Sequence, residues 1–148
     1  MSRNWVTALV VVALAVPMVY FATPSVAFLL SYGCGDREDD LGKVLAAEKV
    51  LESVPPGATR PNSFRECDDD DLVVGAGTEY RYDGKVADAL AHFRKAAPDL
   101  GWKRAGGESC YTKQLDGTTA YLDVYRLDKG RVTASIAASH EFPDESWC

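Results

Sequence analysis

The chain has 148 residues, of which 22 are acidic and 16 are basic, and its formal net charge is −6. This acidic balance disfavours nucleic-acid binding, because a phosphate-binding surface needs clustered Lys and Arg. It also disfavours peripheral docking on anionic lipid. The length beyond the apolar N-terminus suits one ordinary domain.

Residues 1–35 predict an N-terminal membrane anchor or signal segment. No charged residue lies between Arg3 and Asp36, and residues 5–32 are mainly Val, Leu, Ala and Phe. As a helix, residues 5–32 would extend about 42 Å, whereas the hydrocarbon core of a bilayer is roughly 30 Å thick. We therefore expect them to form a transmembrane helix with a single pass.

Two alternatives to an uncleaved anchor remain open. A cleaved signal peptide would end at Ser25-Val26-Ala27, although the next residues stay apolar where a mature chain would begin. A lipoprotein would carry its lipid on Cys34, although the preceding Tyr32 is bulky for the processing site. The anchored form is favoured, with cleaved secretion as its rival.

The cysteines place the remaining residues, 36–148, on the extracytoplasmic side. Cys34, Cys67, Cys110 and Cys148 all follow the apolar segment, are even in number and lack CxxC spacing. This usage is typical of disulfides in an oxidising compartment, whereas structural zinc prefers paired ligands. The basic residues near the segment, Arg3 before it and Arg37, Lys43 and Lys49 after it, do not favour a cytoplasmic N-terminus, but this rule weakens for long translocated domains. Three pairings are possible; we favour Cys67 with Cys110 and Cys34 with Cys148, which would fix both ends of the domain.

Two helices are expected in the folded part. Apolar residues recur at helical spacing through residues 39–54, and Pro55-Pro56-Gly57 ends that helix. A loop is expected from there to about Asp71. The second helix, residues 85–97, has a continuous apolar stripe, with Asp83 placed to cap its start and with Pro98 and Gly101 placed to close it.

The other periodic segments predict strands at residues 72–82, 110–115, 118–127 and 131–139, with a short additional strand beginning at Trp102. Asp116-Gly117 predicts a two-residue hairpin turn. The strand 118–127 should place Ala120, Leu122 and Val124 on one face and Tyr121, Asp123 and Tyr125 on the other. The predicted fold is α+β, a two-layer sandwich of an antiparallel sheet with helices on one face.

The tyrosines predict a possible binding surface. Tyr80, Tyr82, Tyr121 and Tyr125 lie on predicted strands, and exposed aromatic patches often mark interfaces. The alternative is that they are ordinary strand-forming residues.

Acidic and histidine residues give weaker indications. Residues 68–71 are four consecutive Asp, which favour a solvated loop. A calcium site is the alternative, but the sixth position of an EF-hand loop counted from Asp68 is Val73 instead of Gly, and Glu79 at the twelfth position lacks the intervening ligands. His92 and His140 have no sequence partner that makes a catalytic pattern. No catalytic motif and no phosphate-binding loop is found, so we predict no catalytic residue, metal site or cofactor.

Four short stretches resemble small, high-GC actinobacterial proteins that combine an N-terminal anchor or signal with a compact domain. They are Pro55-Pro56-Gly57-Ala58, Thr78-Glu79-Tyr80, Leu100-Gly101-Trp102 and Cys110-Tyr111-Thr112-Lys113. The resemblance covers roughly residues 39–138. It implies the same architecture and extracytoplasmic placement, and it carries no activity or site residue over to this chain.

The expected function is a membrane-anchored extracytoplasmic binding or protein-interaction module, with a protein partner in the membrane or envelope. One rival is a cell-envelope hydrolase or metal-dependent enzyme that uses His140 and nearby acids. Another is a structural accessory subunit of a membrane complex.

Overall fold

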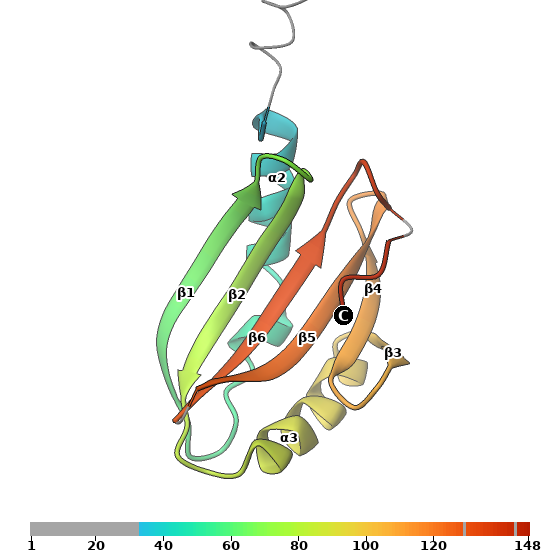
Figure 1. Ribbon diagram of the computed structural model, residues 1–148. Helices are drawn as coiled ribbons and strands as arrows, with labels where there is room; N and C mark the ends of the chain where they lie inside the picture. The colour runs from blue at the N-terminus through green and yellow to red at the C-terminus, as the bar shows by residue number, and fades with distance from the viewer. Residues whose placement is uncertain (1–32, 129, 144) are drawn as a thin grey trace, which may run out of the picture. The chain divides into compact units, whose positions relative to one another are not determined.

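A computed structural model describes residues 33–128, 130–143 and 145–148. They form an α+β domain in which one antiparallel sheet carries its helices on a single face (Figure 1). The predicted membrane span, residues 5–32, lies outside the described residues. Within the described residues, no helix has the length and apolar character needed to cross a membrane.

The sheet has six strands in the order β1-β2-β6-β5-β4-β3, and every neighbouring pair is antiparallel. The strands are β1 (Thr59–Asp68), β2 (Val73–Arg81), β3 (Lys103–Gly106), β4 (Cys110–Leu115), β5 (Thr118–Asp128) and β6 (Arg131–Ala138). The predicted meander is confirmed, and β6 inserts beside β2, so that strands from both halves of the domain form one sheet.

The predicted turn between β4 and β5 is confirmed. Asp116 and Gly117 both have positive φ, 48° and 78°, as the central residues of a type I′ turn require. This turn matches the right-handed twist of the two strands, and it pairs Leu115 with Thr118 directly across the hairpin.

Strand β1 corrects the expectation of a loop from Pro55 to Asp71. Its sequence lacks the Val and Ile of the other strands, and Pro61 falls within the irregular pairing between Thr59 and Asn62. Proline removes a ladder hydrogen bond and is therefore tolerated mainly at sheet edges and bulges. Because β1 is an edge strand, it needs neither a continuous ladder nor strongly apolar residues.

The helices are α2 (Asp36–Ala46), the 3₁₀ helix η1 (Lys49–Glu52) and α3 (Val86–Asp99). The single helix expected over residues 39–54 is therefore wrong, because the backbone leaves helical geometry at Glu48, where ψ is 122°. The capping role expected for Asp83 is also wrong. Lys85 holds the N-cap position of α3, with no side-chain cap among the described residues, and Pro98 lies inside the helix, which runs to Asp99, instead of ending it.

The core lies between the sheet and its helices. Helix α2 packs on β1 and β2, and α3 packs on β3 and β5. The largest fully buried side chains there are Trp102, Tyr80, Tyr111 and Phe93. The centroids of the Tyr80 and Phe93 rings lie 6.1 Å apart, so an aromatic contact joins α3 to β2.

Two disulfides use all four cysteines, but the pairing differs from our expectation. Cys34 is bonded to Cys67, and Cys110 is bonded to Cys148. Alternation explains the difference: Cys67 is paired with the core residue Val74 and faces the helices, whereas Cys110 faces the opposite side of the sheet. Cys67 and Cys110 are therefore separated by the sheet itself. The bond to Cys67 also occupies the Cys34 sulfur that a lipoprotein would acylate.

Candidate functional site

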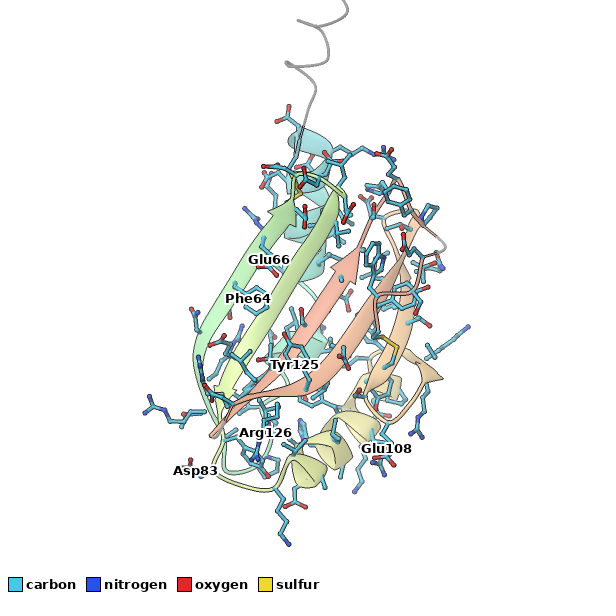
Figure 2. All side chains as sticks on the ribbon, in the orientation of Figure 1. Phe64, Glu66, Asp83, Glu108, Tyr125 and Arg126 are labelled. Carbon is cyan, nitrogen blue, oxygen red and sulfur yellow. A yellow bond between two sulfur atoms is a disulfide. The ribbon has the colours of Figure 1, made fainter. Side chains whose placement is uncertain are left out.

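The sheet face opposite the helices is open, and it is called the open face below. Along β5, Ala120, Leu122 and Val124 are buried against the helices, as predicted. Tyr121, Asp123 and Tyr125 alternate with them and lie on the open face. Figure 2 views the sheet from this side and labels Tyr125 on it.

Small residues make up the middle of the open face. Gly75 and Gly77 of β2 pair with Ala137 and Ser135 of β6. At Gly77 a Cβ atom would lie 2.4 Å from the Phe64 ring and 2.8 Å from the Ala134 carbonyl oxygen. Glycine is thus required at this position because the Phe64 ring from β1 occupies the space of a side chain (Figure 2).

A hollow of about 440 Å³ opens at one end of this floor. Its polar lining includes the carboxylates of Glu66, Asp68 and Asp71, and Trp147 supplies an aromatic side chain. No Lys, Arg or His is among its described lining residues. Asp68 serves the β1–β2 turn, because its Oδ1 accepts hydrogen bonds from the amides of Asp70 and Asp71. Within the part of the chain that the structure describes, the Glu66 and Asp71 carboxylates have no hydrogen-bond or ion-pair partner.

The C-terminal segment brings Trp147 to the hollow. Figure 1 shows this segment crossing in front of β4 and β5, and the Cys110–Cys148 bond ties its end to the open face. The turn that starts the segment is built by Ser139, whose hydroxyl oxygen accepts the amides of Glu141 and Phe142 at 3.2 and 3.3 Å. Trp147 is consequently held in place by a covalent bond at the adjacent residue.

Three buried polar atoms on or beside the open face have no hydrogen-bond partner among the described residues. They are Oγ1 of Thr133, Oδ1 of Asp123 and Nε1 of Trp147. The Thr133 side chain is only 1% exposed, although alternation along β6 points it away from the helices. Buried polar groups are nearly always hydrogen-bonded, and each exception costs about 1–3 kcal/mol. A fourth such atom, the Tyr111 hydroxyl oxygen, lies on the helical side of the sheet.

Acidic groups dominate the electrostatics around Tyr125. Burial raises the pKa of the Tyr125 hydroxyl, and the carboxylates of Asp123, Glu66 and Glu79 raise it further, because each of them disfavours a second negative charge. These carboxylates come from β5, β1 and β2. The open face therefore concentrates negative charge contributed by three strands.

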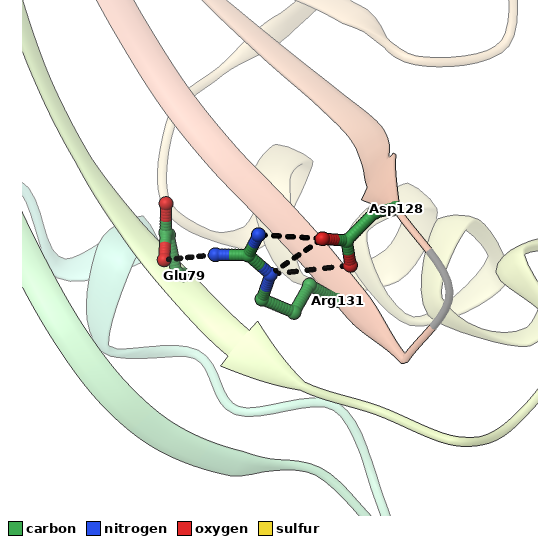
Figure 3. Close-up of polar contacts among 3 residues, drawn as sticks. All are labelled: Glu79, Asp128 and Arg131. Atoms are coloured by element: carbon green, nitrogen blue, oxygen red, sulfur yellow. Dashed lines mark hydrogen bonds and ion pairs between the residues drawn. The ribbon is translucent and has the colours of Figure 1, made fainter.

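One cation of the open face is already engaged. The Arg131 guanidinium bonds both carboxylate oxygens of Asp128 and lies 3.4 Å from Oε2 of Glu79 (Figure 3). The hydrogen bonds from Arg131 hold the pKa of Asp128 below its usual value. This cluster lies near the β5–β6 turn, at the opposite end of β6 from the hollow. Arg131 therefore does not pair with the carboxylates that line the hollow.

The four tyrosines of the predicted binding surface are not brought together. Tyr80 is 0% exposed and Tyr82 is 6% exposed, so both belong to the core. The Tyr80 hydroxyl donates a 2.7 Å hydrogen bond to the Leu51 carbonyl, and burial raises its pKa to about 12. The reason is strand parity, because Tyr80 shares the inward face of β2 with Val74. Only Tyr121 and Tyr125 lie on the open face.

The two histidines lie far from a catalytic arrangement. The His92 ring shares a 2.8 Å hydrogen bond with Ser53, and His140 Nε2 lies 3.3 Å from Asp116 Oδ2. Each meets one polar side chain, and among the described residues no third group completes a nucleophile, base and orienting acid. Over the described ranges, no cluster of three or more His, Cys, Asp or Glu is arranged to hold a metal ion.

The acidic run 68–71 forms the turn between β1 and β2. Besides the bonds to Asp68, Oδ1 of Asp69 accepts the Cys34 amide at 2.9 Å. The run thus ties the start of the described chain to the end of β1.

Sequence reasoning missed Glu66, Thr133 and Trp147 as site residues. The alternation that placed Asp123 beside Tyr121 and Tyr125 was the signal available for the open face. Glu66 could not be placed there because strand β1 was not recognised. Trp147 could not be placed there because the pairing of the adjacent Cys148 was not known.

Comparison of the chain with protein families, with curated proteins and with solved structures returned no match.

Proposed function

We propose that this domain is an extracytoplasmic binding module that recognises a partner protein through the open face of its sheet. The observation that carries the proposal is the contrast between the two faces. One is filled by helices, while the other combines a hollow lined by carboxylates with the partly exposed rings of Tyr121 and Tyr125.

The extracytoplasmic placement is supported by the cysteines. All four are in disulfides, which persist in oxidising compartments and are rare in the cytosol of most organisms. Anchoring through residues 5–32, as a single membrane pass, is part of the proposal and rests on their uncharged sequence. Cleaved secretion would leave the binding face unchanged.

The rival functions gain less support. A hydrolase needs a positioned acid and base in a concave site, and His92 and His140 each meet a single polar side chain. An accessory subunit would contact its complex through the membrane segment rather than through the open face.

Site-specific photocrosslinking tests the proposal. A photoreactive phenylalanine replaces Tyr121 or Tyr125 on the open face, and Lys95 on the exposed side of α3 serves as the control position. In the native membrane, we expect one reproducible protein adduct from the open-face positions and none from position 95. Adducts from position 95 alone, or no adduct from either open-face position, would refute the proposed function.

A further inference from the structure

We infer that the hollow on the open face binds a basic, extended segment of a partner protein, with a Lys or Arg side chain seated between Glu66, Asp71 and Trp147. The inference rests on the proposed function and specifies the chemistry of its partner.

Charge complementarity is the first reason. Three carboxylates line the hollow, no Lys, Arg or His is among its described lining residues, and Asp123 adds negative charge along the same face. Arg65 of β1 points toward α2, where it lies 3.0 Å from Asp39. Arg131, at the opposite end of β6, is paired with Asp128 and Glu79. A cation entering the hollow therefore meets three carboxylates and no cationic lining residue of the described chain.

The Trp147 indole is an independent reason, and it favours a polypeptide. Trp147 lines the hollow, and its Nε1 has no acceptor among the described residues, while Oδ1 of Asp123 on the same face has no donor there. A peptide backbone offers both N–H and C=O groups, while a metal ion or a simple amine cannot supply an acceptor.

The shape and the aromatic wall fit a long basic side chain. Gly75, Ser135 and Ala137 form a shallow floor along which the methylenes of Lys or Arg can lie. The Trp147 ring at the rim can stack on a guanidinium or ammonium group, which the indole face attracts electrostatically.

A peptide titration of the full-length protein in mild detergent tests the inference. The probe is a fluorescein-labelled Gly/Ser peptide with Arg at alternate positions, and the matched probe has Gln in place of each Arg. We expect saturable binding of the Arg peptide in fluorescence anisotropy and none of the Gln peptide over the same range. Binding should weaken as salt rises.

Two variants with the same change in net charge separate the hollow from general electrostatics. Glu66→Gln with Asp71→Asn alters the hollow and spares Asp68, which the turn needs. Glu52→Gln with Asp99→Asn alters two exposed acids on the helical side. We expect the first pair to weaken binding about fivefold or more and the second pair less than about twofold. Far-UV circular dichroism and thermal unfolding confirm that both variants are folded.

Each outcome has a defined meaning. Equal weakening by both variants, or equal binding of the Gln peptide, overturns the basic-partner inference but leaves the proposed function standing if the open-face crosslinks form. Spermine that displaces the Arg peptide at matched charge concentration overturns the preference for a polypeptide. Loss of the crosslinks from Tyr121 and Tyr125 overturns the proposed function itself.

Discussion

The contact between Glu48 and Lys113 is expected to contribute more to stability than any surface ion pair of the domain. Lys113 Nζ lies 2.8 and 3.1 Å from the two Glu48 carboxylate oxygens and also donates to the Leu100 carbonyl at 3.2 Å. Trp102 Nε1 donates to Glu48 at 3.2 Å. The carboxylate thus joins the segment after α2 to β4 and to the chain following α3.

Glu48→Ala should lower the free energy of unfolding by about 2 kcal/mol. The Glu48 side chain is 13% exposed and that of Lys113 is 26% exposed. Removing the Glu48 carboxylate leaves the partly buried Lys113 ammonium without its counter-ion and the Trp102 indole N–H without its acceptor. Breaking a fully buried pair costs about 3–5 kcal/mol, and the remaining exposure of Lys113 reduces that figure. For a domain of this size, about 2 kcal/mol corresponds to a fall in Tm of about 8 °C.

Urea unfolding of the full-length protein, followed by circular dichroism, measures this effect. The matched control is Glu108→Ala, which removes an exposed pair in which Arg94 and Glu108 lie 3.9 Å apart. We expect the control to change stability by less than about 0.5 kcal/mol. The double variant Glu48→Ala with Lys113→Met should be more stable than the sum of the single changes predicts, because no cation is stranded. A loss of stability in Glu48→Ala no larger than that of the control, or additive effects of the two changes, would show that Glu48 and Lys113 do not stabilise the domain as a pair.

Three further predictions concern Gly77 in the sheet, the Cys110–Cys148 disulfide and the buried hydroxyl of Tyr80. Gly77→Ala should destabilise the domain by about 2 kcal/mol, because the new methyl meets an aromatic ring and a backbone oxygen, whereas Gly106→Ala, with open space around it, should be near neutral in thermal unfolding. Cys110→Ser with Cys148→Ser should lower stability by up to about 4 kcal/mol in the loop-entropy model, and acrylamide should then quench tryptophan emission more strongly; unchanged stability and quenching would contradict the tethering role. Burial raises the pKa of Tyr80 to about 12, so the stability that the neutral hydroxyl contributes is complete below pH 10 and is lost as pH rises toward 12. Tyr80→Phe should therefore reduce the fall in the urea unfolding midpoint at alkaline pH. An unchanged fall would exclude Tyr80 as its cause.

The regular parts of this fold could be predicted because their local signals agree with their tertiary roles. Helix α3 has a continuous apolar stripe, and the β4–β5 hairpin has a turn dipeptide that adopts the required left-handed angles. Strand β5 alternates strictly, so both of its faces were assigned correctly. In each case the information lies within about a dozen consecutive residues.

The wrong predictions share one cause: each of these features depends on segments that are distant in the sequence. Strand β1 has weak strand propensity and forms because β2 offers it a pairing edge. The cysteine pairing followed from which face of the sheet each cysteine occupies, and that could not be known without β1. The inward direction of Tyr80 likewise depends on the register of β2, since Gly75 and Gly77 weaken its alternation of polar and apolar residues.

The two disulfides also determine how the domain would respond to mechanical tension. A pull applied between Gly33 and Cys148 enters at Cys34 and crosses directly to Cys67, then leaves through Cys110 into Cys148. The covalent path thus bypasses residues 35–66 and 111–147, which include α2, η1, β5 and β6. It runs through β2, α3 and β3, which makes the stretch between Cys67 and Cys110 the only part of the described chain that can lengthen while both bonds are intact.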